Sequence, residues 1–256
     1  MSTCSIVVPV HNEADHIQGL FMDFWKGVDA IRGKILEVHL VENGSEDATY
    51  RVCKELEAAA AGVVKAHHLG KASYGDAVKR GILNARGDVT VILECDALDV
   101  PFMSRSMALI EAGQADFVVG SKRHPESIDQ RPLKRRMLTL FFNIALKLFF
   151  RFPGTDTHGL KAIRSPVAKE LCGKSITGGE VFQTEIILLA HRLGYRVREV
   201  PVTIREQRKT KILPMQRLPK IIKIVKEIRL SLRRFPRLPA ENQINRAGSS
   251  KSENRL

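Results

Sequence analysis

Three carboxylates, Glu94, Asp96 and Asp99, follow directly after an apolar run at residues 89–93. Five residues rich in β-branched side chains are typical of a strand buried on both faces, as in the centre of a parallel sheet. Glu94 and Asp96 are two residues apart, so a continuing strand would present both on one side. A divalent cation with oxygen ligands would relieve their repulsion, and a hydrated acidic loop is the alternative reading.

The elements that must position these carboxylates follow from the alternation of apolar runs with helix-length segments. Strands are predicted at residues 6–10, 35–41, 63–67 and 89–93, with another within 116–123, and helices between them at 17–31, up to about 61, and at 75–85. Strands separated by helices form βαβ units, so the predicted fold is α/β, with a mainly parallel sheet covered by helices on both faces. The loops after successive strands then lie along one edge, where such sheets bind ligands.

Further polar residues fall on this predicted edge. Pro9 and Glu13 follow the first strand and Glu42 follows the second, where they could supply a wall and acceptors for a nucleotide base. Lys71 and the helix start at Gly75 could face a diphosphate, because unsatisfied amides and the positive end of a helix dipole attract anions. A solvated surface lysine is the alternative for Lys71.

Four motifs follow one another along the edge: Pro9-Val10-His11-Asn12-Glu13, Glu42-Asn43-Gly44-Ser45, Gly70-Lys71-Ala72-Ser73-Tyr74-Gly75 and Glu94-Cys95-Asp96. Their order and spacing resemble those of the family 2 glycosyltransferases. The resemblance implies the nucleotide-diphospho-sugar transferase (GT-A, Rossmann-like) fold. It also implies that the nucleotide of a sugar donor is bound by Pro9, His11, Glu13, Glu42, Lys71, Gly75 and Cys95.

Two of these motifs depart from the family pattern. Glu42 and Glu94 stand where the family usually has aspartate, and the added methylene changes the distance and orientation of each carboxylate. The resemblance implies Mg²⁺ or Mn²⁺ as cofactor, held by Glu94 and Asp96. Asp99 is expected to be a further ligand or to cap the helix beyond Pro101.

The motifs that follow resemble a narrower group, the polyprenyl-phosphate (dolichol-phosphate) mannose and glucose synthases. They are Thr155-Asp156-Thr157-His158-Gly159-Leu160-Lys161, Phe182-Gln183-Thr184-Glu185, Glu199-Val200-Pro201 and Arg208-Lys209-Thr210-Lys211. With the earlier motifs, the resemblance covers about residues 5–212. Leu160 and Lys161 stand where this group has phenylalanine and arginine, and the last motif is shorter than usual.

The narrower resemblance implies roles for the basic residues. Its acceptor is a lipid monophosphate, which is already an anion near neutral pH, so cations rather than a strong general base are required. Glu185 is expected either to act in the cleft or to form a buried ion pair with Lys161 or Arg208. The implied sets are Glu94, Asp96, Arg208 and Lys211 for catalysis, Lys122, Arg135 and Thr139 for the acceptor phosphate, and Asp99, Lys161, Gln183 and Glu185 elsewhere in the cleft.

Residues 133–152 form a helix of unusual composition. Its polar members Arg136, Thr139, Asn143, Lys147 and Arg151 form one narrow stripe, and leucine and phenylalanine dominate the rest. The segment is too short and too interrupted to span a bilayer, which takes about 20 apolar residues. A helix lying in the membrane surface is predicted, and burial between the sheet and another element is the alternative.

The net charge of +13 belongs mainly to the C-terminal part, because residues 205–256 carry fifteen Lys and Arg against four Glu. Apolar residues at helical spacing between 218 and 232 alternate with lysine and arginine, which predicts a basic amphipathic helix suited to anionic lipid. A solvated basic face is the alternative. The expected organisation is a catalytic domain at 1–212, this helix at 213–235 and a disordered tail at 236–256.

The remaining composition bounds the setting. At 256 residues the chain can bury a large core, and its four cysteines have no Cys-x-x-Cys pair, as expected of free thiols in a reducing compartment. The first strand begins near the N-terminus without a signal-peptide pattern. A cytoplasmic protein attached peripherally to the membrane, or recruited by a membrane-protein partner, is therefore expected. Nucleic acid is not an expected partner, since the basic tail lacks interleaved aromatic residues.

The sequence thus predicts transfer of a hexose from a nucleotide diphosphate sugar, such as GDP-mannose or UDP-glucose, to a polyprenyl phosphate at the cytoplasmic membrane face, with inversion and metal assistance. Two alternatives stay open. One is a family 2 glycosyltransferase with a glycan or small-molecule acceptor. The other is a non-catalytic protein that binds a nucleotide or lipid, which Glu42 and Glu94 in place of aspartate would favour.

Overall fold

The computed structural model describes residues 2–60, 62–204 and 218–235, and within them seven strands form one sheet in the order β3-β2-β1-β4-β7-β5-β8. A separate pair, β6 (Ile128–Asp129) and β9 (Thr203–Ile204), lies beyond it. The strands of the main sheet are β1 (Cys4–Val10), β2 (Ile35–Asn43), β3 (Val64–Leu69), β4 (Val89–Ile92), β5 (Phe117–Ser121), β7 (Lys161–Arg164) and β8 (Val197–Pro201).

The predicted mainly parallel sheet is confirmed. Strands β1 to β4 pair in parallel, as do β5 and β8. The five strands predicted from the sequence are present, with their ends shifted by one or two residues. Strand β7 was not predicted, and it runs antiparallel to both of its neighbours, β4 and β5. Its first residue, Lys161, therefore lies at the edge where the parallel strands end.

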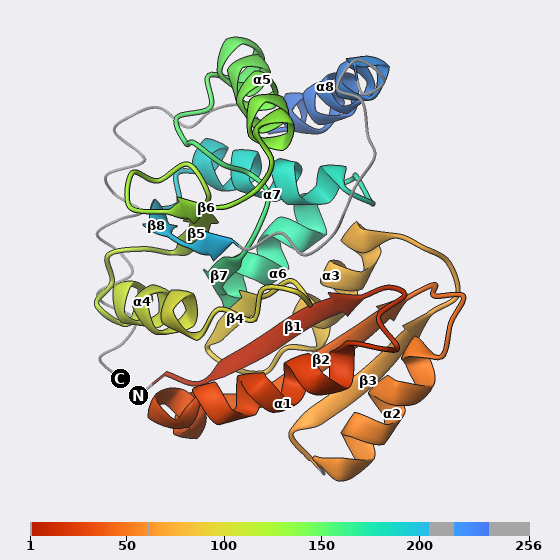
Figure 1. Cartoon of the computed structure of the whole chain (residues 1–256). Helices are drawn as coiled ribbons and strands as arrows, with labels where there is room; N and C mark the ends of the chain where they lie inside the picture. Colours follow the sequence, from red (N-terminus) through yellow and green to blue (C-terminus); the bar gives the residue numbers. More distant parts are fainter. Residues whose placement is uncertain (1, 61, 205–217, 236–256) are drawn as a thin grey trace.

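Helices cover both faces of the sheet, as the βαβ pattern predicts (Figure 1). One face carries α1 (Ile17–Gly27), η1 (Asp29–Lys34), α2 (Thr49–Ala59) and α4 (Val100–Glu111). The other face carries α3 (Tyr74–Asn84), α6 (Ser165–Lys174) and α7 (Val181–Arg192). Two further helices, α5 (Leu133–Phe150) and α8 (Leu218–Arg233), lie together at one end of the molecule beyond α7.

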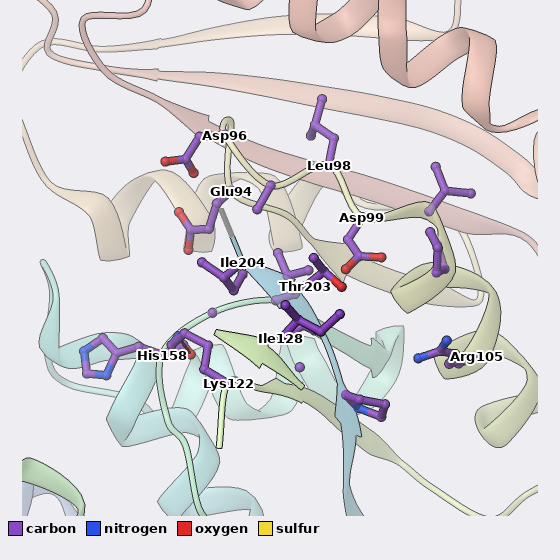
Figure 2. A pocket seen from close by; sticks show the side chains of 18 of the residues that line it. Glu94, Asp96, Leu98, Asp99, Arg105, Lys122, Ile128, His158, Thr203 and Ile204 are labelled. Atoms are coloured by element: carbon purple, nitrogen blue, oxygen red, sulfur yellow. Dashed lines mark hydrogen bonds between the residues drawn. The ribbon is translucent and has the colours of Figure 1, made fainter. Parts of the chain in front are cut away.

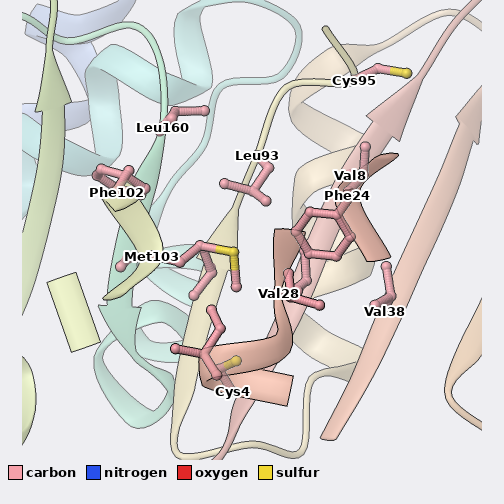
Figure 3. Close-up of a cluster of buried hydrophobic side chains, with 14 of the residues drawn as sticks. Cys4, Val8, Phe24, Val28, Val38, Leu93, Cys95, Phe102, Met103 and Leu160 are labelled. Carbon is pink, nitrogen blue, oxygen red and sulfur yellow. The ribbon is translucent and has the colours of Figure 1, made fainter. Parts of the chain in front are cut away.

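Two apolar clusters hold these layers together. The first joins β1, β2 and β4 to α1 and α4, and Figure 3 shows Phe24, Val28, Phe102 and Met103 packed around Leu93 at the end of β4. Each fully buried side chain of this size contributes about 1.5–3 kcal/mol relative to exposure. Because Leu93 is completely buried, the residue that follows it is held at a fixed place on the sheet edge.

The second cluster fixes α5 and α8 to the body of the protein. Leu146 of α5 and Ile228 and Leu232 of α8 are buried among side chains of α6 and α7. The hydroxyl of Ser231 donates to the buried carboxylate of Glu185 on α7. The predicted boundary before residue 213 and the predicted tail at 236–256 lie outside the described residues.

Helix α5 turns its apolar side outward. Asn143, which the sequence places in the polar stripe, is 3% exposed, and its amide donates to the carbonyl of Thr155 at 2.7 Å. The large apolar side chains that stay exposed on this helix are Leu133, Met137, Leu140, Phe141, Ile144, Leu148 and Phe149. Burial of the whole helix, the alternative reading, is therefore not seen in the described part of the chain. None of the described helices has the length and hydropathy needed to cross a membrane.

A buried carboxylate ties the opposite edge of the sheet together. Glu37 of β2 is fully buried and accepts hydrogen bonds from Ser5 at 2.9 Å, Lys65 at 2.8 Å and the backbone and guanidinium of Arg86 at 2.7 and 2.9 Å. These donors come from β1, β3 and the segment before β4. Burial raises the pKa of Glu37, but the hydrogen bonds outweigh it and hold the pKa well below its usual range.

We predict that Glu37→Gln lowers the free energy of unfolding by about 3 kcal/mol, because a fully buried carboxylate loses its charge-assisted hydrogen bonds with Lys65 and Arg86. Since the folded-state pKa is depressed, this stabilisation is present above the unfolded pKa near 4.5 and is lost as the pH falls below it. Urea unfolding between pH 3 and 7 measures both effects. The free energy of unfolding of the variant should fall less steeply than that of the unaltered protein as the pH is lowered. Glu111→Gln, which removes the ion pair of Lys34 with a carboxylate that is 28% exposed, is the control and should cost less than about 1 kcal/mol. Equal losses in the two variants would contradict the assignment.

Candidate functional site

A cleft of about 1210 Å³ opens beside the end of β4. Its wall includes the segment after β4, the first turn of α4, the loop before β7 and strand β9. Figure 2 shows Glu94 and Asp96 at one part of this cleft, with Asp99 and Arg105 further along it and Lys122 and His158 on the opposite wall. The carboxylate cluster predicted from the sequence therefore lines this cleft.

A tight turn carries the first two carboxylates. Strand β4 ends at Ile92, and the amide of Ala97 donates to the carbonyl of Glu94 at 2.9 Å, so Glu94 and Asp96 lie on one turn rather than on a continuing strand. Glu94 is half-buried and Asp96 is exposed. Both side chains project from the same side of the turn in Figure 2.

Asp99 has a clear structural role. It is the N-cap of α4, and its carboxylate accepts a hydrogen bond from the amide of Phe102 at 2.8 Å. Such a cap typically stabilises a helix by about 1 kcal/mol. Of the two roles expected from the sequence, capping is the one that the geometry displays.

Glu94 is held by two other elements. Its Oε1 atom accepts from the hydroxyl of Tyr74, the first residue of α3, at 2.8 Å, and from the amide of Gln183 in the first turn of α7 at 3.3 Å. The Gln183 carbonyl in turn accepts from the amide of Gly159 at 3.2 Å and from the ammonium of Lys161. The turn after β4, α3 and α7 thus meet at one carboxylate, and β7 is linked to it through Gln183.

Lys161 is completely buried at the start of β7. Its ammonium donates to the carbonyl of Gly159 at 2.8 Å as well as to Gln183. Burial lowers the pKa of Lys161 to about 7, because the charged form loses its hydration. The ion pair with Glu185 considered from the sequence is not formed.

The opposite wall of the cleft presents a second lysine. The Lys122 ammonium lies 3.1 Å from the buried carboxylate of Asp156 and also donates to the carbonyl of His158. Desolvation, followed by the nearby charge of Lys122, lowers the pKa of His158 to about 4. At neutral pH this wall therefore presents an ammonium beside a neutral imidazole.

The first and second loops of the edge are joined by hydrogen bonds. Asn12 has a left-handed backbone conformation, with φ 53°. Its side-chain oxygen accepts a hydrogen bond from the backbone amide of Glu46 at 2.9 Å, and its backbone amide donates to the hydroxyl of Ser45 at 3.0 Å. The His11 ring donates to the carbonyl of Asn43 at 2.8 Å. This network fixes the two loops that the sequence assigns to nucleotide binding.

Glu42 is buried at the end of β2 and is tied back by two groups. Its carboxylate accepts from the amide of Ser45 and is bonded to the ring of His68 on β3. His68 packs in turn on the ring of Tyr50, with centroids 4.8 Å apart. If Glu42 accepts a hydrogen bond from a nucleotide base, its carboxylate must therefore do so in addition to its bonds with Ser45 and His68.

The other predicted nucleotide residues differ in exposure. Pro9 and Glu13 are buried, while Lys71 is exposed. Cys95 is buried, and its thiol lies in the first core cluster, where burial raises its pKa to about 12. Gly75 has a packing role, because a Cβ there would lie 2.7 Å from Phe182 and 2.8 Å from the carbonyl of Gly179.

The remaining predictions divide between described and undescribed parts. Thr139 on α5 accepts from Arg131 at 3.4 Å. The side chain of Arg135 and the whole of Arg208 and Lys211 lie outside the described residues. Glu185 is fully buried, does not line the cleft, and accepts from the amides of Ile176 at 2.9 Å and Thr177 at 3.0 Å.

Sequence reasoning gave no role to several polar residues that line the cleft, among them Tyr74, Arg131 and His158. Tyr74 lies in the third motif, one position before Gly75, and a tyrosine at the first turn of a helix near an acidic motif was the available signal. His158 belongs to the motif at residues 155–161, but no role was assigned to it. Arg131 carried no such signal, because only the tertiary fold brings the segment after β6 to the cleft.

Comparison with known families identifies this arrangement. A family model described as "Glycosyl transferase family 2" matches residues 5–171, which span β1 to most of α6. The chain belongs to this family. The match includes the first, second and third loops of the edge and the Glu94 turn, and the predicted GT-A fold is therefore confirmed.

Three curated proteins are similar to this family member. Glycosyltransferase AglD from Haloferax volcanii is 27% identical over 81% of the chain, which spans only 34% of that protein. Dolichyl-phosphate beta-glucosyltransferase from Saccharomyces cerevisiae is 26% identical over 79% of the chain and 66% of its own length. The protein of that name from Dictyostelium discoideum is 26% identical over 88% of the chain and 73% of its own length.

Solved structures agree on the fold. Mannosyl-3-phosphoglycerate synthase from Rubrobacter xylanophilus superposes with a TM-score of 0.64 at 21% identity, over 91% of this chain and 74% of that one. Glucosyl-3-phosphoglycerate synthase from Mycobacterium tuberculosis, in complex with Mn²⁺, UDP and phosphoglyceric acid, gives 0.59 at 19% identity, over 90% and 77% of the two chains.

We predict that Gly44→Ala costs about 1–3 kcal/mol more in unfolding free energy than Gly113→Ala. Both glycines have left-handed φ, at +63° and +66°, so both substitutions carry the same backbone strain. A Cβ at Gly44 would lie 2.5 Å from the carbonyl carbon of Lys71, whereas a Cβ at Gly113 meets nothing within 4 Å. Urea denaturation of the two variants measures the difference. Equal destabilisation would show that the second and third loops do not approach as described.

Proposed function

We propose that this protein transfers a hexose from a nucleotide diphosphate sugar to a polyprenyl phosphate at the cytoplasmic face of a membrane, with inversion at the anomeric carbon. The observation that carries the proposal is the Glu94–Asp96 turn in the cleft, at the end of β4, which pairs in parallel with β1 as β1 does with β2. The similarity to two dolichyl-phosphate beta-glucosyltransferases over most of the chain supports the acceptor class.

The donor nucleotide is proposed to lie over the joined first and second loops. His11 and Glu13 follow β1 and Glu42 lies near the end of β2, and the exposed Lys71 precedes the N-terminus of α3, where a diphosphate could approach. Unpaired amides at a helix start and a lysine both favour a phosphate anion. Arg208 and Lys211 are proposed to close over the same diphosphate.

The carboxylate pair fits a hard divalent cation. Among the described residues no group of three or more His, Cys, Asp or Glu forms a complete protein cage. Mg²⁺ is commonly bound by one or two carboxylates together with substrate phosphates, so Glu94 and Asp96 with a donor diphosphate are a sufficient set. When bound, Mg²⁺ or Mn²⁺ would screen the charge that builds on the leaving diphosphate. Mn²⁺ with UDP is present in the structurally similar glucosyl-3-phosphoglycerate synthase.

The acceptor phosphate is proposed to meet the wall opposite Glu94. Lys122 is held there by Asp156 and His158, with Arg135 and Thr139 on α5 as further contacts. A phosphate monoester is already anionic, so the role of these groups is to hold and orient it. Attack from this side, across from the diphosphate, would invert the anomeric carbon.

Membrane attachment is proposed through α5 and α8. The exposed apolar face of α5 would enter the interfacial region, and exposed Lys226, Arg229 and Arg233 of α8 would face anionic lipid. In this proposal the acceptor lipid reaches the cleft from the membrane surface that α5 and α8 contact. A membrane-protein partner would act on the same side.

We predict that Glu94→Ala and Asp96→Ala each lower transfer by about 10²–10³-fold, because each removes charge that organises the leaving diphosphate. The assay incubates labelled GDP-mannose or UDP-glucose with polyprenyl phosphate and Mg²⁺ or Mn²⁺ and measures organic-soluble label released by mild acid. Glu55→Ala, on the exposed side of α2, is the matched control and should retain full activity.

The same assay, combined with calorimetric titration of nucleotide diphosphates with and without Mg²⁺ or Mn²⁺, separates the alternatives. Transfer to a glycan or small molecule, with no labelled lipid from any donor, would replace the proposed acceptor. Metal-independent nucleotide binding without turnover would favour a non-catalytic protein. Full activity in both alanine variants would rule out the carboxylate turn as the catalytic centre.

We predict that Leu148→Glu combined with Phe149→Glu lowers binding to anionic phospholipid vesicles more than tenfold. These side chains are 75% and 57% exposed, and burying each in lipid contributes about 1.5–3 kcal/mol. Vesicle sedimentation measures the bound fraction. Leu83→Glu on α3, where the leucine is 60% exposed, is the control and should bind like the unaltered protein. Unchanged binding of the double variant would exclude α5 as the attachment surface.

A further inference from the structure

The donors around Glu94 converge on a single oxygen. Tyr74 and Gln183 both donate to Oε1, from the first turns of α3 and α7. Among the described residues neither donor reaches Oε2, which is therefore the oxygen available to a ligand in the cleft. A glutamate side chain has one more rotatable bond than aspartate. Two hydrogen bonds to one of its oxygens restrict this additional rotation.

The orientation of the Gln183 amide is set by chemistry. A lysine ammonium and a backbone amide are donors only, and both Lys161 and Gly159 point at the same atom of the Gln183 carboxamide. That atom must be the carbonyl oxygen. The amide nitrogen of Gln183 is then directed at Glu94, where it is a donor to the carboxylate.

Lys161 has no other evident use. It is completely buried, does not line the cleft, and among the described residues its ammonium bonds to a backbone carbonyl and to Gln183 rather than to a carboxylate. Burying an ammonium with two neutral acceptors is costly. Methionine would fill the same space, so a buried lysine here is explained by what its charge does to Gln183 and, beyond it, to Glu94.

We propose that Tyr74 and the Lys161–Gln183 pair are positioning residues that hold Glu94 Oε1 and present Oε2 to the divalent cation of the donor complex. This inference rests on the proposed function. In this proposal the two donors hold the Glu94 side chain, which is longer than an aspartate side chain, in one orientation. Preorganised carboxylates bind a cation without the cost of ordering at the moment of binding.

Two variants test the pair of donors separately. Tyr74→Phe removes one donor and keeps the ring. Gln183→Glu keeps an acceptor for Lys161 and Gly159 but removes the amide donor that faces Glu94. Tyr195→Phe is the matched control, because the Tyr195 hydroxyl donates to the carboxylate of Glu170 outside the cleft.

Calorimetric titration gives a readout independent of turnover. UDP and GDP are titrated into each full-length variant with and without Mn²⁺, and the Mn²⁺ concentration for half-maximal enhancement is measured. We expect Tyr74→Phe to raise that concentration about tenfold, the effect of losing one hydrogen bond to a charged group. Gln183→Glu should raise it at least as much, because its carboxylate also repels Glu94 from the position that the Gln183 amide holds. Metal-free nucleotide affinity and the unfolding temperature should match those of Tyr195→Phe.

Each other result has a distinct meaning. If the unaltered protein binds Mn²⁺ and nucleotide and both variants need no more Mn²⁺ than it does, the positioning role is overturned. A parallel fall in unfolding temperature and in metal-free affinity would show that the bonds merely hold α3 to α7, and would overturn it too. If the unaltered protein shows no Mn²⁺-dependent nucleotide binding, it is the proposed function that fails.

Discussion

The reversed direction of β7 is the constraint on which the site depends. Its neighbours β4 and β5 run in parallel and end at the cleft, so β7 must begin there, and its first residue pairs with Ile92 and Val119. That residue is Lys161, fully covered by the sheet and α7. A buried ammonium requires acceptors, and it finds them in Gly159 and Gln183. The polar network beneath the cleft is thus a consequence of strand topology.

The sequence predicts most of the sheet but not this strand. Residues 89–93 are recognisable because β-branched apolar side chains form a buried run, and the helices between strands show the 3.6-residue period. Strand β7 is four residues long with lysine first and arginine last, so neither alternation nor an apolar run marks it. Its role is fixed by neighbours distant in the chain, which a local pattern does not contain.

The same distinction applies to individual site residues. The positions of Glu94, Asp96 and Asp99 follow from the end of β4 and the start of α4. Glu185 reads in sequence as a cleft carboxylate, yet its oxygens are taken by Ile176, Thr177 and Ser231. Packing decides whether such a carboxylate lies in the cleft or in the core. On the first turns of α7, one helix face points to the cleft and another points to the core.

Glu42 and Glu94, which stand where the resemblance leads one to expect aspartate, are both held by hydrogen bonds to neighbouring residues. Glu42 is tied back by Ser45 and His68, and Glu94 by Tyr74 and Gln183. In both places nearby donors restrain a longer side chain.

Helix α5 buries a polar side chain, Asn143, and exposes large apolar ones, including Phe141 and Phe149. Contiguous apolar surface of this kind drives self-association when no lipid covers it. In aqueous buffer the expected behaviour is therefore concentration-dependent clustering through this helix. Detergent or lipid that covers this surface should suppress the clustering, so the association state of the purified protein reports on whether the apolar face of α5 is covered.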